Sequence, residues 1–183
     1  MSTGLERCMY CEDSAGTDID HFRPKASYPA DAFRWRNFLH ACSHCNSNEK
    51  RAAFPLGTKG QPLLLDPTAD DPYAHLQFVW ETGTFIGQTP QGMETERVFG
   101  LNRRSALERG RRNTWVAVRA LLDLHRASID AAERKRIREV VRELPFQAVV
   151  QHFLRDAIAQ RSNVPAAISA EVIATQADWA WAL

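Results

Sequence analysis

Two pairs of cysteines near the start of the chain constrain its fold more than any other feature. Two residues separate Cys8 from Cys11, and two separate Cys42 from Cys45. A pair with this spacing turns two thiolates toward one ion, and two such pairs complete the tetrahedral shell that zinc prefers. Four thiolates leave no open coordination position, so we predict a structural zinc ion bound by Cys8, Cys11, Cys42 and Cys45.

Two other uses of the cysteines stay open from the sequence, namely a rubredoxin-type iron site and a redox dithiol. His40 and His44 lie close enough to replace a cysteine, but four cysteines suffice, so we expect both to be surface residues or neighbours of the metal site. A head of about fifty residues buries too little apolar surface to be stable alone. A structural zinc can add roughly 10–16 kcal/mol of apparent binding free energy, which explains the need for it.

The composition is that of an ordinary globular protein: 183 residues, 44% hydrophobic, with a formal net charge of +1. No stretch approaches the roughly 18 apolar residues of a membrane span. The N-terminal segment has no apolar signal-peptide core either, so we expect a cytoplasmic protein. A balanced total can conceal a local basic surface. Five arginines crowd one short stretch, where we expect a solvated helix face or a partner surface, with nucleic-acid contact as the alternative: Arg103, Arg104, Arg109, Arg111 and Arg112.

The pattern along the chain predicts an α+β fold. Leu76, Phe78 and Trp80 alternate with other residues ahead of a turn at Gly83, so we expect a β-hairpin over 76–88. From about residue 93 apolar residues recur at helical spacing. The residues expected on buried helix faces are Val116, Ala120, Leu121, Leu124, Ile137, Val140, Val141 and Leu144, and then Phe146, Val149, Val150, Phe153, Leu154 and Ile158.

Three positions mark expected boundaries or core residues in the helical part. The residue before a proline avoids helix, so we expect a break at Leu144, ahead of Pro145. Ser169 is a candidate N-cap for a last helix. That helix would carry Trp179 and Trp181, which we expect to lie in the core, with an interface as the alternative.

A second group of residues suits the hydrolysis of phosphodiesters. Asp20 and His21 end an expected strand over 17–20. Imidazole is mostly neutral yet basic at pH 7, which suits a general base, and a divalent ion on oxygen ligands can neutralise a leaving oxygen. Neighbours on a strand point to opposite faces, so both residues can serve one site only where the strand ends or twists. Asn46 directly follows a predicted zinc ligand, and a helix beginning there would place Lys50 on the same face.

The order of these residues over Cys8–Lys50 resembles an HNH endonuclease of the ββα-metal type, in its four-cysteine form. The resemblance implies that His21 is the general base and that Asn37 ties the loop between the two strands and orients the base. It implies that Asp20 and Asn46 bind the catalytic divalent ion, Mg²⁺ or another cation. The residues implied to face substrate phosphates are Arg23, Lys25 and Lys50, the last of these lying one position beyond the family's usual lysine.

A looser likeness continues beyond Lys50. Leu64-Leu65-Asp66-Pro67, the turn at Gly83 and Gly100-Leu101-Asn102 ahead of an arginine-rich helix are similar to HNH proteins encoded beside an ATPase in Septu-type anti-phage systems. The likeness implies a defence role and an ATPase partner. We therefore expect an HNH core over 1–56, a loop and hairpin extension over 57–92, and a helical region over 93–183.

Together these features predict a metal-dependent endonuclease that acts on nucleic acid, with DNA as the favoured substrate and RNA as the alternative. The main competing hypothesis is a zinc-stabilised module that binds nucleic acid without cutting it. Asp20, His21 and Asn46 are all present, which favours cleavage.

Overall fold

Two short β-hairpins precede a mostly helical region in the computed structural model, which describes residues 6–182. The first hairpin pairs strand β1 (Asp18–His21) antiparallel with β2 (Phe38–Ala41). The second pairs β3 (Leu76–Val79) antiparallel with β4 (Thr84–Gly87). The predicted α+β class and the hairpin over 76–88 are therefore confirmed.

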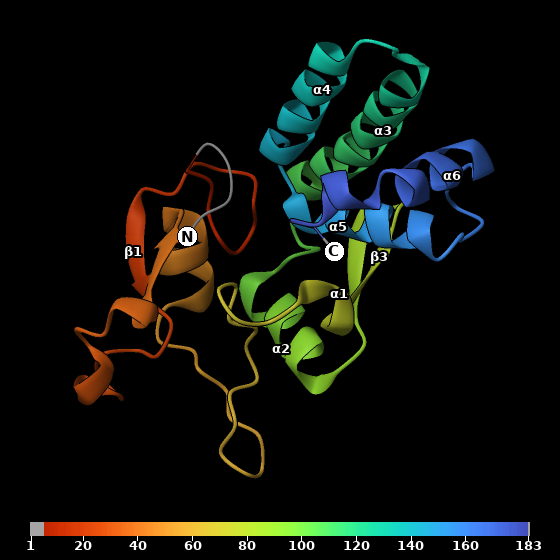
Figure 1. Cartoon of the computed structure of the whole chain (residues 1–183). Helices are drawn as coiled ribbons and strands as arrows, with labels where there is room; N and C mark the ends of the chain where they lie inside the picture. The colour runs from red at the N-terminus through yellow and green to blue at the C-terminus, as the bar shows by residue number, and fades with distance from the viewer. Residues whose placement is uncertain (1–5, 183) are drawn as a thin grey trace.

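Residues 6–56, called the head below, carry the first hairpin and the cysteines. The loop between β1 and β2 contains two 3₁₀ turns, η1 (Pro29–Asp31) and η2 (Trp35–Asn37). After β2 the chain enters a π-helix, η3 (His44–Lys50). The expected helix at Asn46 is thus present, and it begins slightly earlier. In Figure 1 the head is red and orange and lies to one side of the helical region.

The connection between the head and the long helices is built from capped short elements. Helix α1 (Pro72–His75) begins at Asp71, whose carboxylate accepts a hydrogen bond from the Tyr73 amide. Helix α2 (Pro90–Phe99) is capped by Thr89 at its start and by Gly100 at its end. Gly100 has the left-handed conformation that glycine commonly adopts after a helix C-terminus. The helical part therefore begins at Pro90, a little before residue 93, because a threonine cap and a proline start the helix.

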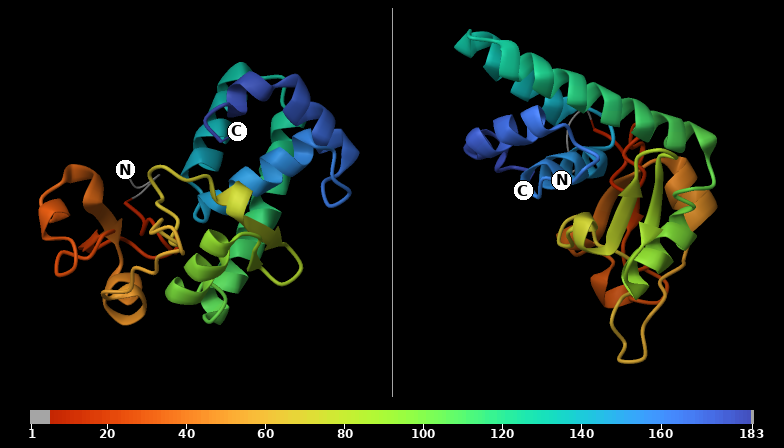
Figure 2. Two further views of the ribbon diagram at one scale, coloured as in Figure 1. Left: turned by 90° about the horizontal axis from the view of Figure 1, so that it is seen from below. Right: turned by 90° about the vertical axis from the view of Figure 1, so that its right-hand side faces the viewer.

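Helix α5 (Gln147–Ile158) forms the centre of the helical region and packs against α3 (Ser105–Ala127) and α6 (Ala166–Ala174). Helix α4 (Ala131–Glu143) returns along α3, and a short 3₁₀ turn η4 (Gln176–Trp179) follows α6. Figure 2 shows α3 as the longest helix, crossing one side of the molecule. The apolar stripe of α5 is buried as predicted, and burial extends beyond it around most of the helix.

The buried face of α3 differs from the expected one. Val116 is 65% exposed and Leu124 is 47% exposed, whereas Trp115, Val118 and Leu122 are buried. The helix itself was predicted correctly, but most of the residues assigned to its buried face lie outside that face. The reason is that α3 also buries polar side chains at helical spacing on this face, and these concealed the pattern from a hydrophobicity count: Arg111, Thr114 and His125.

Of the other expectations for the helical part, the helix end and the buried tryptophan are confirmed, and the N-cap is wrong. Helix α4 ends at Glu143, with Leu144 as its C-cap, so the predicted break before Pro145 is confirmed. Trp179 is fully buried, as expected for a core residue. Ser169 does not cap a helix, because α6 starts at Ala166 after Pro165 and Ser169 lies buried inside it. Proline at the helix start supplies the signal instead.

A buried polar network joins three helices in the part of the chain that the structure describes. His125 of α3 is fully buried, and its Nδ1 lies 2.8 Å from Glu171 Oε1 of α6. Arg138 of α4 donates to His125 Nε2 at 3.3 Å. A neutral imidazole satisfies both contacts, donating through Nδ1 and accepting at Nε2. Between residues 6 and 182, no helix combines the length and apolar character that crossing a membrane requires.

We predict that the helical region loses stability as the pH falls below about 6.5, the ordinary pKa of histidine. Burial lowers the pKa of His125, and the bond to Glu171 only partly opposes that effect. The unfolded chain therefore takes up a proton at a pH where the folded chain does not, and this difference weakens folding as the pH falls. Urea denaturation at about pH 7.5 and about pH 5.5, followed by helical circular dichroism, measures the loss.

His125→Gln should be less stable than the natural protein at the higher pH but should lose less on acidification. His44→Gln, a change at a more exposed histidine of the head, is the matched control and should keep the full pH dependence. Equal pH dependence in His125→Gln and the natural protein would contradict the prediction.

Candidate metal centre and the site beside it

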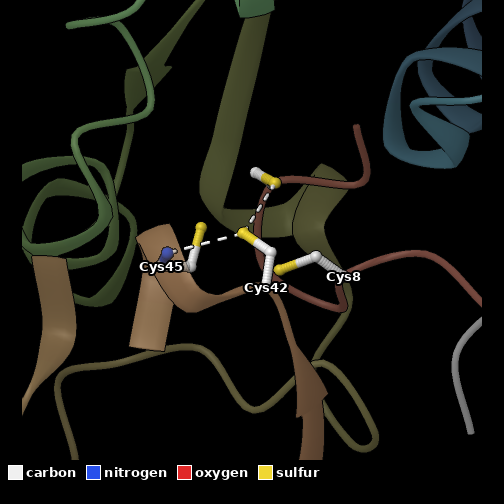
Figure 3. A group of neighbouring side chains, drawn as sticks. Cys8, Cys42 and Cys45 are labelled. Atoms are coloured by element: carbon white, nitrogen blue, oxygen red, sulfur yellow. Dashed lines mark hydrogen bonds between the residues drawn. The ribbon is translucent and has the colours of Figure 1, made fainter. Parts of the chain in front are cut away.

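The four cysteines form one buried cluster. All four sulfurs lie within 4.8 Å of one another, and no disulfide joins them. Cys11 Sγ lies 3.9 Å from Cys42 Sγ, close to the roughly 3.8 Å edge of a tetrahedron with Zn–S distances of about 2.3 Å. Figure 3 shows the sulfurs of Cys8, Cys42 and Cys45 turned toward a common centre. The cluster thus has the donors and the spacing of a structural zinc site.

Local backbone structure brings each pair of sulfurs together. After the first pair, the amide of Glu12 donates to the carbonyl of Cys8 in a tight turn, with Glu12 at a φ of 59°. At the second pair, the Cys45 amide points at Cys42 Sγ, 3.5 Å away. Hydrogen bonds from neighbouring thiols, Cys42 first, lower the pKa of the Cys11 thiol, whereas hydrogen bonds with Cys11 raise the pKa of the Cys8 and Cys45 thiols. A lowered pKa favours the thiolate, which is the form that binds metal.

The arginine-rich stretch joins the metal cluster to the helical region. Arg104, just before α3, donates to Cys45 Sγ at 3.7 Å, and Arg103 pairs with Glu49 of η3. Arg111 is 1% exposed and donates to the carbonyls of Gly83 and Leu101. The expectation of a solvated face is therefore wrong for Arg104 and Arg111. Four thiolates on one Zn²⁺ would carry a net negative charge, which the Arg104 guanidinium at the cluster would offset.

A second contact between the head and the helical region lies beside the first cysteine pair. The carboxylate of Glu12 accepts a hydrogen bond from the Ala148 amide at 3.0 Å, at the start of α5. An acidic group at a helix N-terminus satisfies a free amide and interacts favourably with the helix dipole. Glu12, directly after Cys11, and Cys45 itself thus both contact the helical region, so the cysteine cluster fixes the orientation of the head.

His21 ends β1 and reaches back to the following loop. Its Nε2 lies 3.0 Å from the carbonyl oxygen of Ala32, and its ring meets the edge of Phe38, with centroids 5.1 Å apart. A carbonyl oxygen can only accept, so Nε2 carries the hydrogen in this geometry. The other ring nitrogen, Nδ1, therefore keeps its lone pair and is the atom that can take a proton.

Asn37 ties the same loop together. Its Oδ1 accepts from the Arg23 amide at 2.7 Å, and its Nδ2 donates to the carbonyls of Arg23 and Asp31, each at 3.0 Å. Asn37 is buried, so these bonds lie away from solvent. Its contacts therefore brace the backbone just before Ala32, the partner of His21.

Asp20 and Lys50 form a buried ion pair. The Lys50 ammonium lies 2.9 Å from a carboxylate oxygen of Asp20 and also donates to the carbonyl of His21 at 2.7 Å. The hydroxyl of Tyr10, which lies between the first two cysteines, donates to the same carboxylate. Burial lowers the pKa of Lys50, and the adjacent carboxylate opposes that effect. Lys50 therefore braces the end of β1 from inside, and this position does not support the expected contact with a substrate phosphate.

Asn46 contacts Asp18 and not Asp20, the residue with which it is expected to share a metal ion. Its Nδ2 donates to Asp18 at 3.1 Å, whereas Asp20 is held by Lys50 and Tyr10. Asp18 and Asp20 share one face of β1 because side chains alternate along a strand. Asn46 and Lys50 share the facing side of η3, as predicted. The result is two parallel contacts between strand and helix, one through each carboxylate.

The remaining expected substrate residues lie on the surface. Arg23 is exposed, lies 3.7 Å from Asp31 and sits over the Tyr28 ring. Lys25 is exposed. His44 bonds Glu49 at 3.1 Å, which fits a histidine beside the metal cluster rather than a ligand of it. Three residues that contact or support the site were not predicted from the sequence: Tyr10, Glu12 and Asp18. Only Asp18 could have been found, because its alternation with Asp20 places both carboxylates on one face of the strand.

We predict that Cys8→Ser and Cys42→Ser each abolish zinc binding and unfold the head. A hydroxyl is a poor ligand for zinc, and three thiolates cannot complete the buried shell. Metal analysis of the purified protein should find one zinc per chain, and thermal unfolding followed by near-UV circular dichroism should lose its cooperative transition in both variants.

His44→Ala, a change between two ligands of the same knuckle, is the matched control and should retain zinc. A well-folded Cys8→Ser protein without metal would contradict the structural role of the cluster. A coloured protein containing iron would instead support the rubredoxin-type alternative.

Comparison with known proteins finds relatives over about half of the chain. No family model and no solved structure matches the chain. The Septu protein PtuB of Bacillus mycoides (strain KBAB4) is 31% identical over 133 residues, which cover 56% of this chain and 45% of that protein. The Septu protein PtuB of Bacillus thuringiensis is 31% identical over 101 residues, covering 52% and 37%. The matched regions thus span less than half of either relative, and over about half its own length the chain is homologous to Septu protein PtuB.

Proposed function

We propose that this protein is a metal-dependent endonuclease of the HNH type, which hydrolyses phosphodiester bonds of nucleic acid. The observation that carries the proposal is the contact between His21 Nε2 and the carbonyl of Ala32, 3.0 Å apart. That contact fixes the tautomer and leaves Nδ1 free as a base. It occurs in a loop braced by Asn37 and beside a four-cysteine cluster, as the resemblance to HNH endonucleases implies.

The base acts on a water molecule. With Nε2–H bonded to Ala32, Nδ1 of His21 accepts a proton from a water that attacks phosphorus. The carbonyl also stabilises the imidazolium that forms, because its oxygen accepts from the charged ring. A positioned base of this kind accelerates hydrolysis by about 10²–10⁴-fold. Asn37 and Lys50 act as positioning residues, one through the loop and the other through the His21 carbonyl.

The face of β1 toward η3 offers the oxygen donors that a hard divalent ion requires. Asn46 already contacts Asp18, and Asp20 is the carboxylate next to the base in the chain. We propose that these three residues hold the ion, Mg²⁺ or another divalent cation. In the structure the Lys50 ammonium supplies the positive charge at Asp20. Asp20 can therefore bind the ion only if the ion displaces that ammonium. Bound there, the ion would neutralise charge on the leaving oxygen.

Positive side chains on the surface of the same loop suit the substrate backbone. Arg23 and Lys25 follow His21 in the chain, and both are exposed. Contacts of this kind fix the position of a polynucleotide without reading its sequence. DNA is the favoured substrate. RNA is the alternative, because a base and an ion that act on the phosphodiester do not distinguish the two.

The similarity to PtuB supports a biological setting. The matched relatives are Septu proteins, and Septu systems are anti-phage defence systems that pair an HNH protein with an ATPase. We propose that this chain is the nuclease component of such a system and acts with an ATPase partner in the cytoplasm. The alternative is a zinc-stabilised module that binds nucleic acid without cutting it. The free Nδ1 of His21 favours cleavage over that alternative.

We predict that His21→Ala abolishes cleavage and leaves the fold and the zinc content unchanged. The ring is only half-buried and packs against one aromatic edge, so its removal disturbs little of the head. Conversion of supercoiled plasmid to nicked and linear forms measures the activity, and metal analysis with a thermal melt checks the rest.

His40→Ala removes the other histidine of this hairpin and is the matched control; it should keep cleavage. Cleavage by His21→Ala at a rate comparable with that of the natural protein would refute the assignment of the base.

We predict that Asp18→Asn raises the Mg²⁺ concentration needed for half-maximal cleavage by about tenfold or more, because one carboxylate is lost from the ion site. Asp20→Asn should do the same and should also destabilise the head. Removing one partner of a buried ion pair typically costs about 3–5 kcal/mol. Titration of cleavage with Mg²⁺ and thermal melts of each variant separate the two effects.

Asp13→Asn, a change in a nearby acidic residue outside the proposed site, is the control and should leave the Mg²⁺ dependence unchanged. If Asp18→Asn behaves as the natural protein does, Asp18 is not a ligand. Full activity in a stable Asp20→Asn protein would remove the proposed ion site altogether.

A further inference from the structure

Two large aromatic side chains stand almost fully in solvent on the loop between β1 and β2. Phe33 is 94% exposed and Trp35 is 79% exposed, whereas Trp115 and Trp179 are buried in the helical region. In Figure 1 this orange-red loop projects from the head on the side away from the helical region. Aromatic residues stabilise a fold mainly through burial, so these two contribute little to the core and are available to a ligand.

The loop that carries the two rings is held in one conformation. The Asn37 side chain bonds the backbone of Arg23 and Asp31, and the Asn37 amide donates to the Arg34 carbonyl at 2.9 Å. The Trp35 ring also meets the edge of Phe38, with centroids 6.5 Å apart. A ligand that contacts these rings therefore has little loop entropy to overcome, which favours binding.

The charge of the loop matches a polyanion. Residues 22–37 contain four basic side chains and one acidic side chain, a net of +3, whereas the whole chain carries +1. All four basic side chains are exposed. Arginines alternate with the aromatic residues in Phe33-Arg34-Trp35-Arg36. Cations interleaved with flat rings favour a ligand that carries both phosphates and bases over a purely apolar partner.

The aromatic pair lies next to the proposed base. Ala32, whose carbonyl bonds His21 Nε2, directly precedes Phe33. On the other side, the Phe38 ring contacts both His21 and Trp35. Ile19, which shares the His21 face of β1 by strand alternation, is 60% exposed. A nucleotide stacked on this surface would therefore hold its neighbouring phosphates close to the base.

We propose that Phe33 and Trp35 form a stacking platform for unpaired bases, so that the substrate is a single-stranded or locally unpaired segment of nucleic acid. The proposal rests on the function proposed above for the identity of the ligand. Bases in a duplex already stack on one another, so an aromatic side chain reaches their faces only where pairing is absent. Stacking on an aromatic ring tolerates every base, which predicts little sequence preference.

Fluorescence anisotropy with short labelled oligonucleotides tests the platform. The His21→Ala protein serves as the parent, because it should bind without cutting while Mg²⁺ and zinc remain present. We expect single-stranded DNA and RNA to bind more tightly than the matching duplexes. Phe33→Ala and Trp35→Ala should each weaken single-strand binding about tenfold and leave duplex binding within about twofold. Trp35→Phe keeps a flat ring and should restore most of the affinity.

Trp80→Ala, at a tryptophan of the second hairpin that is 41% exposed, is the matched control and should bind as the parent does. Unchanged single-strand binding in both Phe33→Ala and Trp35→Ala overturns the platform. An equal loss for single strands and duplexes also overturns it, because it indicates a general electrostatic effect. Intact nucleic-acid binding with lost binding to the purified ATPase partner would make this surface a protein interface.

The same variants separate this inference from the proposed function. A natural protein that cleaves nucleic acid, together with platform variants that bind and cleave single strands normally, removes the platform and leaves the nuclease. A natural protein that never cleaves, but binds single strands through Phe33 and Trp35, keeps the platform and supports the non-cleaving alternative.

Discussion

The four-thiolate cluster is the constraint on which the rest of the structure depends. Its ligands come from two segments that are separated by the whole β1–β2 hairpin, so a shared ion closes that hairpin into one unit. The residues beside the ligands then carry the connections outward. Glu12 holds the start of α5, Asn46 contacts β1, and Cys45 itself receives a hydrogen bond from Arg104. Loss of the ion would therefore loosen the site and the attachment of the helices together.

Strand β1 divides the candidate site into two sides. One side carries Asp18 and Asp20, which face η3 and are already paired with Asn46 and Lys50. On the other side His21 faces the loop and the Phe38 ring. The two sides meet where β1 ends, at His21. A phosphodiester bound at this end of β1 would have the base on one side and the ion on the other, so both would act on the same phosphorus. The loop, with its cations and exposed rings, lies on the side of the base.

The sequence alone predicted the features that depend on local patterns. Cysteine spacing identified the metal cluster, alternation identified the second hairpin, and the proline after Leu144 marked a helix end. It failed where a polar residue is buried by tertiary contacts. Arg111 was expected in solvent and lies in the core, and Lys50 was expected at the substrate and pairs with Asp20. Burial of a charge depends on a partner far along the chain, and a single sequence gives no sign of that partner.

The most direct test of the account is cleavage by the zinc-loaded protein with and without added Mg²⁺. Supercoiled plasmid and a structured RNA would be incubated with the protein, and strand breaks would be scored on denaturing gels. We expect breaks in at least one substrate that depend on the divalent ion, while the zinc content stays constant. A folded, zinc-loaded protein that leaves both substrates intact at every ion concentration, also in the presence of the proposed ATPase partner, would rule out the nuclease.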